Sequence, residues 1–278
     1  MDAPRAPTPT GTVPPAPPAE NAEPRRRRAD RARAVADVLR QQIHTGRFAS
    51  GELPGEAALC TEFAVSRNTV RDALALLRDD GLVERIPRLG TLVTGRKYGH
   101  GLDHLLGLNE ILCEHGGIRN EVRVAMETTA PPGVAHRLDL PAGAPVVYVE
   151  RLRHLGDLPL SLDLTYLAPE VGLPLLEQDL EHNDVFVLIE RALGRPLGLA
   201  DITLEAVNAD AHSAAVLHTP PGAALLLLER LTRLDDGRPV DLEYIRFRGD
   251  RLTMHGRLNR PTPTAPTPVP TPVPEPRS

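Results

Sequence analysis

The sequence predicts an α+β protein of two domains: an N-terminal winged helix-turn-helix and a second domain built on an antiparallel sheet. Two observations lead to this prediction. Residues 56–94 hold two short helical patterns separated by a tight turn and followed by a β-hairpin. Residues 143–167 and 222–247 form a weak internal repeat of strand, polar turn and returning strand, with helical patterns between the copies. A chain of 278 residues has room for both cores.

The first helical pattern covers residues 57–63, and the turn falls on residues 64–65. Ser66 follows, and its hydroxyl is suited to accept a hydrogen bond from the first turn of the next helix. The apolar residues of that helix recur at helical spacing and predict one buried stripe. They are Val70, Ala73, Leu74 and Leu77. Gly81 is expected to end the helix.

Polar side chains in the first turns of this second helix are expected to stand off the apolar stripe. They are Arg67, Asn68, Thr69 and Arg71. A helix N-terminus attracts phosphate, arginine can bind guanine with two hydrogen bonds, and Asn or Thr can read other base edges. Residues 82–86 and 91–94 then read as the two strands of a wing around a tip at residues 87–90. This order predicts a unit that reads duplex DNA.

Residues 31–94 resemble the winged helix of the GntR family of bacterial transcription regulators. The shared positions are Leu53-Pro54, Glu56, Leu59, Val65-Ser66-Arg67, Thr69-Val70-Arg71, Ala73-Leu74, Leu77, Gly81-Leu82-Val83 and Gly90-Thr91. So many matches at fixed spacing make a specific signal. The chain departs from the family at Gly55, Ala64 and Leu89, where a capping Ser, a turn Gly and a basic wing residue are usual. The resemblance implies a set of DNA-binding residues: Glu56, Ser66, Arg67, Asn68, Thr69, Arg71, Arg88 and Gly90.

The charge distribution agrees with a DNA-binding front. The net charge is −5, but residues 1–97 hold 16 Lys+Arg against 12 Asp+Glu, or +4, and residues 98–260 hold 15 against 24, or −9. No apolar run is long enough to span a membrane, and no signal-peptide core is visible, so we expect a cytoplasmic protein without a membrane partner. Cys60 and Cys113 read as buried thiols, with a redox switch as the alternative.

Both ends of the chain are rich in proline. Residues 1–28 and 261–278 hold 16 of the 29 prolines, which predicts extended arms that cannot bury a core. Residues 25–28 are four consecutive arginines at the end of the first arm. They are either a solvated charge run or an arm that adds phosphate contacts and salt-dependent affinity.

Residues 29–97 are therefore expected to be the DNA-binding domain and residues 98–117 a linker with a leading helix over Leu102–His115. His100 and His104 lie four residues apart, with Cys113 and His115 nearby. A zinc site needs three or four convergent ligands. We therefore expect no metal and no cofactor.

Residues 118–260 are expected to form the second domain. Beyond the hairpins, residues 180–193 read as a helix, 199–207 as a strand and 209–217 as a helix. If the first hairpin turns about Asp157, four polar side chains share one sheet face. They are Arg151, Arg153, Ser161 and Asp163. Two guanidiniums there suit a phosphate or carboxylate ligand, and the alternative is a set of ordinary salt bridges on an exposed face.

Residues 118–257 resemble the ligand-sensing UTRA domain of the HutC branch of GntR regulators, whose fold is similar to chorismate lyase. The matching pieces are residues 149–153, 160–167, 179–180 and 236–251. In relatives that sense phosphosugars, an Arg-x-Arg pair holds the phosphate and acids on the returning strands hold the sugar; Arg151, Arg153, Asp163 and Asp241 match these. Asp163 and Asp241 stand where Glu is common, and Phe247 stands where Tyr is common, which implies a different ligand or pose. The expected effector-binding residues are Arg151, Arg153, Ser161, Asp163, Asp241, Glu243 and Phe247.

The sequence thus predicts a ligand-responsive transcription repressor, a homodimer on a palindromic DNA operator, released by a small anionic metabolite such as a phosphorylated sugar or a carboxylate. One alternative is an enzyme, although no Ser/His/Asp or Cys/His arrangement stands out. The GntR branch with a pyridoxal-phosphate domain is excluded, because Lys97 is the only lysine and the chain is too short. The other alternative is a DNA-binding protein whose second domain only dimerises.

Overall fold

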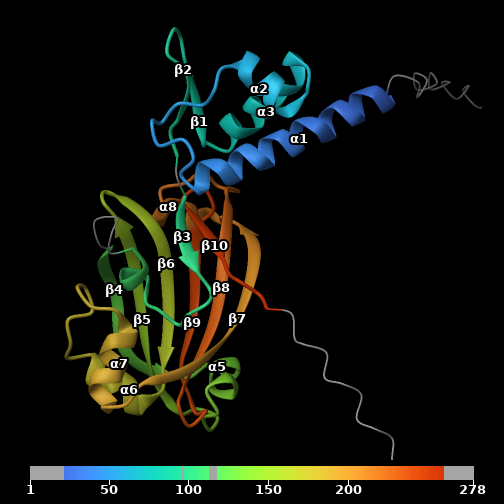
Figure 1. The fold of residues 1–278 in the computed structure, drawn as a ribbon. Helices are drawn as coiled ribbons and strands as arrows, with labels where there is room; N and C mark the ends of the chain where they lie inside the picture. Colours follow the sequence, from blue (N-terminus) through green and yellow to red (C-terminus); the bar gives the residue numbers. More distant parts are fainter. Residues whose placement is uncertain (1–21, 96, 113–117, 260–278) are drawn as a thin grey trace, which may run out of the picture. The chain divides into compact units, whose positions relative to one another are not determined.

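The computed structural model describes residues 22–95, 97–112 and 118–259, and it confirms the predicted α+β class. The chain divides into two compact units, Met1–Tyr98 and Gly99–Ser278. Figure 1 shows a mainly helical first unit and a second unit built on one large sheet. No described helix is long and apolar enough to cross a membrane.

The first unit is a three-helix bundle with a two-stranded wing. It contains α1 (Ala22–His44), α2 (Glu56–Phe63), α3 (Arg67–Asp79), β1 (Val83–Ile86) and β2 (Gly90–Val93), and the two strands pair antiparallel. Its core is made of aliphatic side chains from all three helices. The fully buried ones include Leu39, Ile43, Leu59, Val70, Ala73 and Leu77.

The turn between α2 and α3 is as expected from its residues. Ala64 ends α2 in the left-handed conformation, with φ of 51°, which favours the glycine usual there. Ser66 caps α3 by accepting a hydrogen bond from the Thr69 amide at 3.3 Å. Gly81 follows α3 with φ of 69°, as expected for the residue that ends this helix.

Cys60 was expected to be buried, but it is half-buried. Cys113 lies outside the described residues.

Helix α1 begins earlier than the sequence indicated. Residues 22–28 were expected to belong to an extended arm, but they are the first turns of α1. Pro24 lies near the start of the helix, where its missing N–H costs no hydrogen bond. The arginine run at residues 25–28 therefore has helical backbone.

The second unit is organised around a six-stranded antiparallel sheet in the order β4-β5-β6-β9-β8-β7. Its strands are β4 (Ile118–Thr129), β5 (Pro145–Leu155), β6 (Leu158–Leu167), β7 (Leu197–Asn208), β8 (Ala224–Leu234) and β9 (Pro239–Arg248). The hairpin β5-β6 turns at Gly156 and Asp157, as predicted.

The internal repeat extends over the whole sheet. Its first copy is β4, α5 (Pro132–Arg137), β5 and β6, and its second copy is β7, α8 (Ala211–Val216), β8 and β9. Because β6 pairs with β9, the two copies meet at the centre of the sheet. The turns also match: Asp139 and His218 both have φ near 50°, at 53° and 50°. The sequence reading found the hairpins but missed β4 and α5.

Different helices pack on the two faces of the sheet. Helices α5 and α8 pack on an apolar face that includes Val146, Leu231 and Leu162. Helices α6 (Pro169–Leu175) and α7 (Val185–Leu193) pack on the opposite face, against Val147 and Val149. Side chains alternate along a strand, so Arg151 and Arg153 continue the face of Val147 and Val149.

Two helices differ from the sequence reading. Residues 102–107 are not helical; β3 (Tyr98–Gly101) pairs with β10 (Leu252–His255), and only α4 (Leu108–Leu112) is helical there. Cys113 and His115 fall outside the described residues. The helix expected over residues 180–193 starts at Val185, because Asp184 adopts the extended backbone of an N-cap residue. Helix α6 was missed, since Pro174 lies inside it.

Candidate functional site

The first candidate site is the exposed N-terminal part of α3. Arg67 and Asn68 occupy its first turn and are both exposed, directly after the cap at Ser66. The N–H groups at the start of a helix and the positive end of the helix dipole favour an anion. The buried stripe on the opposite side fixes the helix against α1.

Thr69 requires a correction. It was expected to stand off the apolar stripe, but only 4% of it is exposed. Its hydroxyl lies 2.9 Å from the Ser66 hydroxyl, so it takes part in the cap of α3. The backbone of the first turn places Thr69 on the side of Val70 and Ala73, which are both buried.

Glu56 links α3 to the wing. Its carboxylate accepts a hydrogen bond from the Arg71 Nε at 2.9 Å and lies 3.6 Å from the Arg85 Nη1. Glu56 thereby holds two exposed arginines, one from α3 and one from β1, on the same side of this unit. Sequence reasoning missed Arg85: strand alternation would place it on the side of the buried Val83, yet it is exposed in this short strand.

The wing tip carries the remaining predicted residues. Arg88 and Gly90 are exposed and both have positive φ, 71° and 102°. The Leu89 amide donates to the Ile86 carbonyl at 3.2 Å and closes the turn. Arg88 therefore projects from a tight, defined turn rather than from a loose loop.

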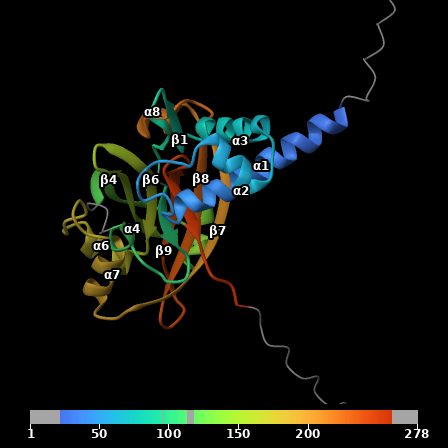
Figure 2. The same cartoon turned by 45° about the horizontal axis from the view of Figure 1, so that its top comes forward.

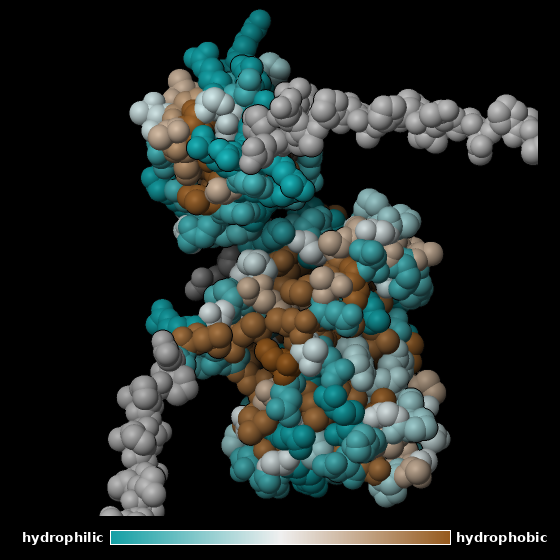
Figure 3. Space-filling view, turned by 90° about the vertical axis from the view of Figure 1, so that its right-hand side faces the viewer, coloured by the Kyte–Doolittle hydropathy of each residue, from teal (hydrophilic) through white to brown (hydrophobic). Residues whose placement is uncertain are grey.

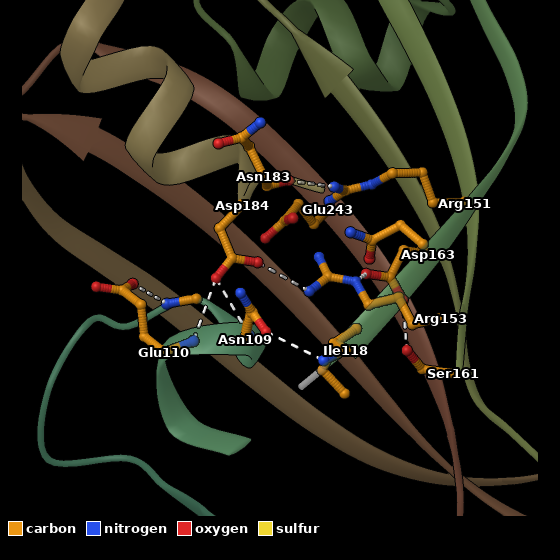
Figure 4. A network of polar contacts seen from close by, with 12 residues as sticks. Asn109, Glu110, Ile118, Arg151, Arg153, Ser161, Asp163, Asn183, Asp184 and Glu243 are labelled. Atoms are coloured by element: carbon orange, nitrogen blue, oxygen red, sulfur yellow. Dashed lines mark hydrogen bonds and ion pairs between the residues drawn. The ribbon is translucent and has the colours of Figure 1, made fainter. Parts of the chain in front are cut away.

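The second candidate site is a buried layer of charged side chains on the sheet face that α6 and α7 partly cover (Figure 4). Every predicted effector residue lies in it, and each is at most 3% exposed: Arg151, Arg153, Ser161, Asp163, Asp241, Glu243 and Phe247. The alternative of salt bridges on an exposed face is therefore wrong about exposure. Ion pairs are nevertheless present.

Arg153 forms two ion pairs within the layer. Its guanidinium contacts the Asp163 carboxylate and lies 3.5 Å from Asp184. The Ser161 hydroxyl donates to Asp163 at 2.7 Å. Burial opposes the charge of Arg153, but Asp163 and Asp184 outweigh it and raise the pKa of Arg153.

Asp184 ties this pair to the start of α4. Its Oδ2 accepts hydrogen bonds from the Asn109 and Glu110 amides at 3.1 and 3.3 Å (Figure 4). A Cβ on Gly107 would lie 2.3 Å from the same oxygen, so only glycine fits there. Sequence reasoning gave no signal for Asp184, which is far from Arg153 along the chain.

Arg230 makes the second buried ion pair. It lies opposite Glu243 across β8 and β9, and its Nε donates to the Glu243 carboxylate at 2.7 Å. Its guanidinium also stacks on the Phe186 ring at 4.4 Å. Burial raises the pKa of Glu243, but Arg230 together with Arg153 and Arg151 outweighs burial, so the pKa is lowered overall. The internal repeat could have predicted Arg230 as a site residue, because Arg230 aligns with Arg151 of the first copy.

Arg151 and Asp241 are the charged members of the layer that form no ion pair with the described residues. Arg151 donates only to the Asn183 carbonyl, at 3.4 Å, and its Nε and Nη2 have no hydrogen-bond acceptor among the described residues. Burial, with the like charge of Arg153, lowers the pKa of Arg151 to about 10. Both oxygens of Asp241 lack a described donor, and burial together with Glu243 raises the pKa of Asp241 well above its usual value.

A cavity of about 240 Å³ opens beside this layer. Its walls are residues 100–105, parts of β7 and β8, and Arg230. His100 is buried there at the edge of the Phe247 ring, and burial with nearby Arg230 lowers the pKa of His100 to about 4. In the described ranges, no group of three or more His, Cys, Asp or Glu is placed to hold a metal ion.

Two family models match the chain. Residues 31–93 match the model of bacterial regulatory proteins of the gntR family. Residues 115–253 match the UTRA domain. The two matches fall on the two units that the structure separates.

Named relatives resemble the chain over most of its length. The HTH-type transcriptional regulator Rv0792c of Mycobacterium tuberculosis is 29% identical over 82% of this chain and 86% of its own. The histidine utilization repressor of Klebsiella aerogenes is 28% identical, covering 80% and 92%. The transcriptional repressor NagR of Bacillus subtilis is 28% identical, covering 79% and 90%. The crystal structure of PhnF from Mycobacterium smegmatis superposes with a TM-score of 0.60 at 26% identity, covering 81% and 99%.

Proposed function

This chain belongs to the GntR family of bacterial transcription regulators and carries a UTRA domain, and on that premise we propose that it is a cytoplasmic repressor whose operator binding is released by a small anionic metabolite. Members of this family are regulators rather than enzymes. The name of repressor given to several relatives supports the direction of control proposed here.

The observation that carries DNA reading is the exposed first turn of α3. Arg67 and Asn68 stand free of the buried stripe, and Glu56 holds Arg71 beside them. Such a helix end enters the major groove, where arginine binds guanine with two hydrogen bonds. Arg85 and Arg88 of the wing are suited to the neighbouring phosphates.

We propose a homodimer because one such helix reads only a few base pairs and a palindromic operator requires two-fold symmetry. Strand β7 is an edge of the sheet and exposes large apolar side chains, with Leu199 at 55%, Ile202 at 43% and Leu204 at 39%. Figure 3 shows brown, apolar surface on this side of the second unit. Exposed apolar edge strands pair readily with another chain. A second copy of β7 is the partner proposed here.

The proposed effector site is the buried layer beside the cavity. Arg151 has N–H groups without acceptors, and Asp241 has oxygens without donors. A ligand that presents an oxyanion to Arg151 and a hydroxyl or ammonium group to Asp241 would satisfy both. A phosphorylated sugar and a hydroxy- or amino-carboxylate both meet this description.

The test is calorimetry of the full-length protein against a panel of sugar phosphates and hydroxy- or amino-carboxylates, followed by operator titration with each ligand that binds. We expect saturable binding without turnover and operator affinity weakened roughly 5–150-fold, the usual range of allosteric coupling. Arg151→Met should abolish this response, and Arg191→Met, an exposed position on α7, should keep it. Turnover would identify an enzyme. Absence of any binding would favour a second domain that only dimerises.

A further inference from the structure

The N-terminal part of α1 is rich in arginine, and residues 26–31 do not contribute to the core. Residues 26–33 hold five arginines and one aspartate. Residues 26–31 are all exposed, and from residue 26 onward the first buried side chain is Ala32. The buried stripe then continues through Val35, Ala36 and Leu39. Packing therefore explains the helix only from Ala32 onward.

Two ion pairs fix the direction of α1 along α3. Arg28 lies 2.6 Å from Asp72, and Arg40 contacts Asp80. Both helices therefore run the same way, with the N-terminal part of α1 beside the N-terminal part of α3. Figure 2 shows α1 passing α3 and extending beyond it.

The helix rise places this extension at the reading end of α3. At about 1.5 Å per residue, α3 extends roughly 7.5 Å from Asp72 back to Arg67. Over the same direction α1 extends roughly 9 Å from Arg28 back to Ala22. The arginines at residues 25–28 extend only roughly 4.5 Å of this length, so they lie alongside residues 69–72, and the start of α1 at Ala22 reaches the level of Arg67, where base contacts are proposed.

The charges of the extension do not favour a helix by themselves. Residues 26–33 hold five arginines and one acid, Asp30, so this excess of like charge opposes the helix. Cations near a helix N-terminus are also opposed by the helix dipole. Asp72 offsets Arg28, but Arg26, Arg31 and Arg33 have no ion pair among the described residues. A polyanion beside this segment would remove the repulsion.

We infer that the N-terminal extension of α1 is a second DNA-contacting element, which binds the phosphate backbone flanking the bases that α3 reads. The inference rests on the proposed function, since it requires α3 to lie in the groove. Its contacts are to phosphates, so they add affinity without sequence preference. The arginine run is thus part of a helix that the Arg28–Asp72 ion pair holds against α3.

The test compares two triple variants of the full-length protein. One is R26Q/R27Q/R31Q, and the matched control is R119Q/R191Q/R257Q, three exposed arginines of the second unit. Glutamine keeps the helix propensity of arginine, which circular dichroism can verify. Affinities for operator and for unrelated duplex are measured from 50 to 200 mM salt, on duplexes with and without flanking sequence.

Each phosphate contact contributes about 0.9 to the slope of log K against log salt. Because the proposed dimer carries two copies of the three arginines, we expect the α1 variant to lower the magnitude of this slope by up to about 5 on both DNAs, leaving the operator-to-unrelated affinity ratio unchanged. Trimming the flanks should produce the same loss in the unmodified protein. A slope that matches the control variant, or a loss confined to the operator, would overturn the inference. Failure of the unmodified protein to discriminate between the two DNAs would instead refute the proposed function.

Discussion

Arg151 and Arg153 occupy successive inward positions on β5, and we expect their replacement by methionine to have opposite effects on stability. Arg153 contacts Asp163 and Asp184, all buried. Arg151 has one long hydrogen bond, 3.4 Å to the Asn183 carbonyl, and no acidic partner at contact distance. Methionine is a flexible, unbranched side chain that can fill either space.

The magnitudes follow from these contacts. Arg153→Met leaves two carboxylates buried without their cation, which typically costs about 3–5 kcal/mol. A unit of this size loses about 2–4 °C per kcal/mol, so its melting temperature should fall by about 6–20 °C. Arg151→Met loses a bond worth about 1 kcal/mol but also removes unsatisfied donors whose desolvation costs about 1–3 kcal/mol. Its stability should be unchanged or up to about 2 kcal/mol higher.

Calorimetric unfolding of both variants, combined with operator titration, checks the prediction. Arg151→Met should bind operator as the unmodified protein does but no longer respond to the effector. We therefore assign Arg153 a positioning role, through its ion pairs with Asp163 and Asp184, and Arg151 a ligand-binding role. Equal destabilisation by the two substitutions would refute this division. The double replacement cannot separate these roles, since loss of Arg153 perturbs the fold.

Three further predictions concern single residues. Arg67→Ala should weaken operator binding by about 1–3 kcal/mol and relax specificity at one base pair, whereas Arg78→Ala at the far end of α3 should not; equal effects in a binding titration would contradict this. Ser66→Ala should lower the free energy of unfolding by about 0.5–2 kcal/mol through loss of the α3 cap, with Ser66→Thr as the control in urea unfolding. Burial raises the pKa of Asp241 in the folded state, so the folded protein favours the protonated carboxyl. The contribution of this carboxyl to the free energy of unfolding is fully present below about pH 3.9, the pKa of Asp in the unfolded chain. It is lost as pH rises through the folded pKa. Asp241→Asn should therefore gain stability over the unmodified protein as pH rises above 4, and a pH-independent difference would argue against it.

The helix-turn-helix was predictable because residues close together in the sequence determine where its helices begin and end. A serine before a helical stripe predicts a cap, and a glycine after it predicts a stop, and both are present at Ser66 and Gly81. Thr69 was misplaced because four polar residues in one turn cannot all face outward. The length of α1 was also missed, since four arginines after a proline-rich stretch resemble an arm and a helix equally well.

The second domain was predictable only as far as its repeat. The hairpins were visible because the two copies share a Glu-Arg-Leu run, and the inward face of β5 followed from strand alternation. The helices and loops that pack on that face come from segments distant in sequence, and no local sequence pattern predicts that Asp184 or His100 lies near β5. Burial of the charged residues could not be derived either, because alternation assigns a face but not what packs on it.

The repeat also explains why one half of the layer differs from the other. Arg151 opposite Asp163 corresponds to Arg230 opposite Glu243, so both copies keep an arginine facing an acid across a hairpin. The next pair differs: Arg153 faces Ser161 in the first copy, whereas Thr232 faces Asp241 in the second. Arg153 reaches across to Asp163 and leaves Arg151 unpaired, while Asp241 faces a hydroxyl instead of a cation. A symmetric sheet thus acquires unpaired donors in one half and unpaired acceptors in the other, and a ligand with an acidic and a hydroxyl or amino group matches that difference.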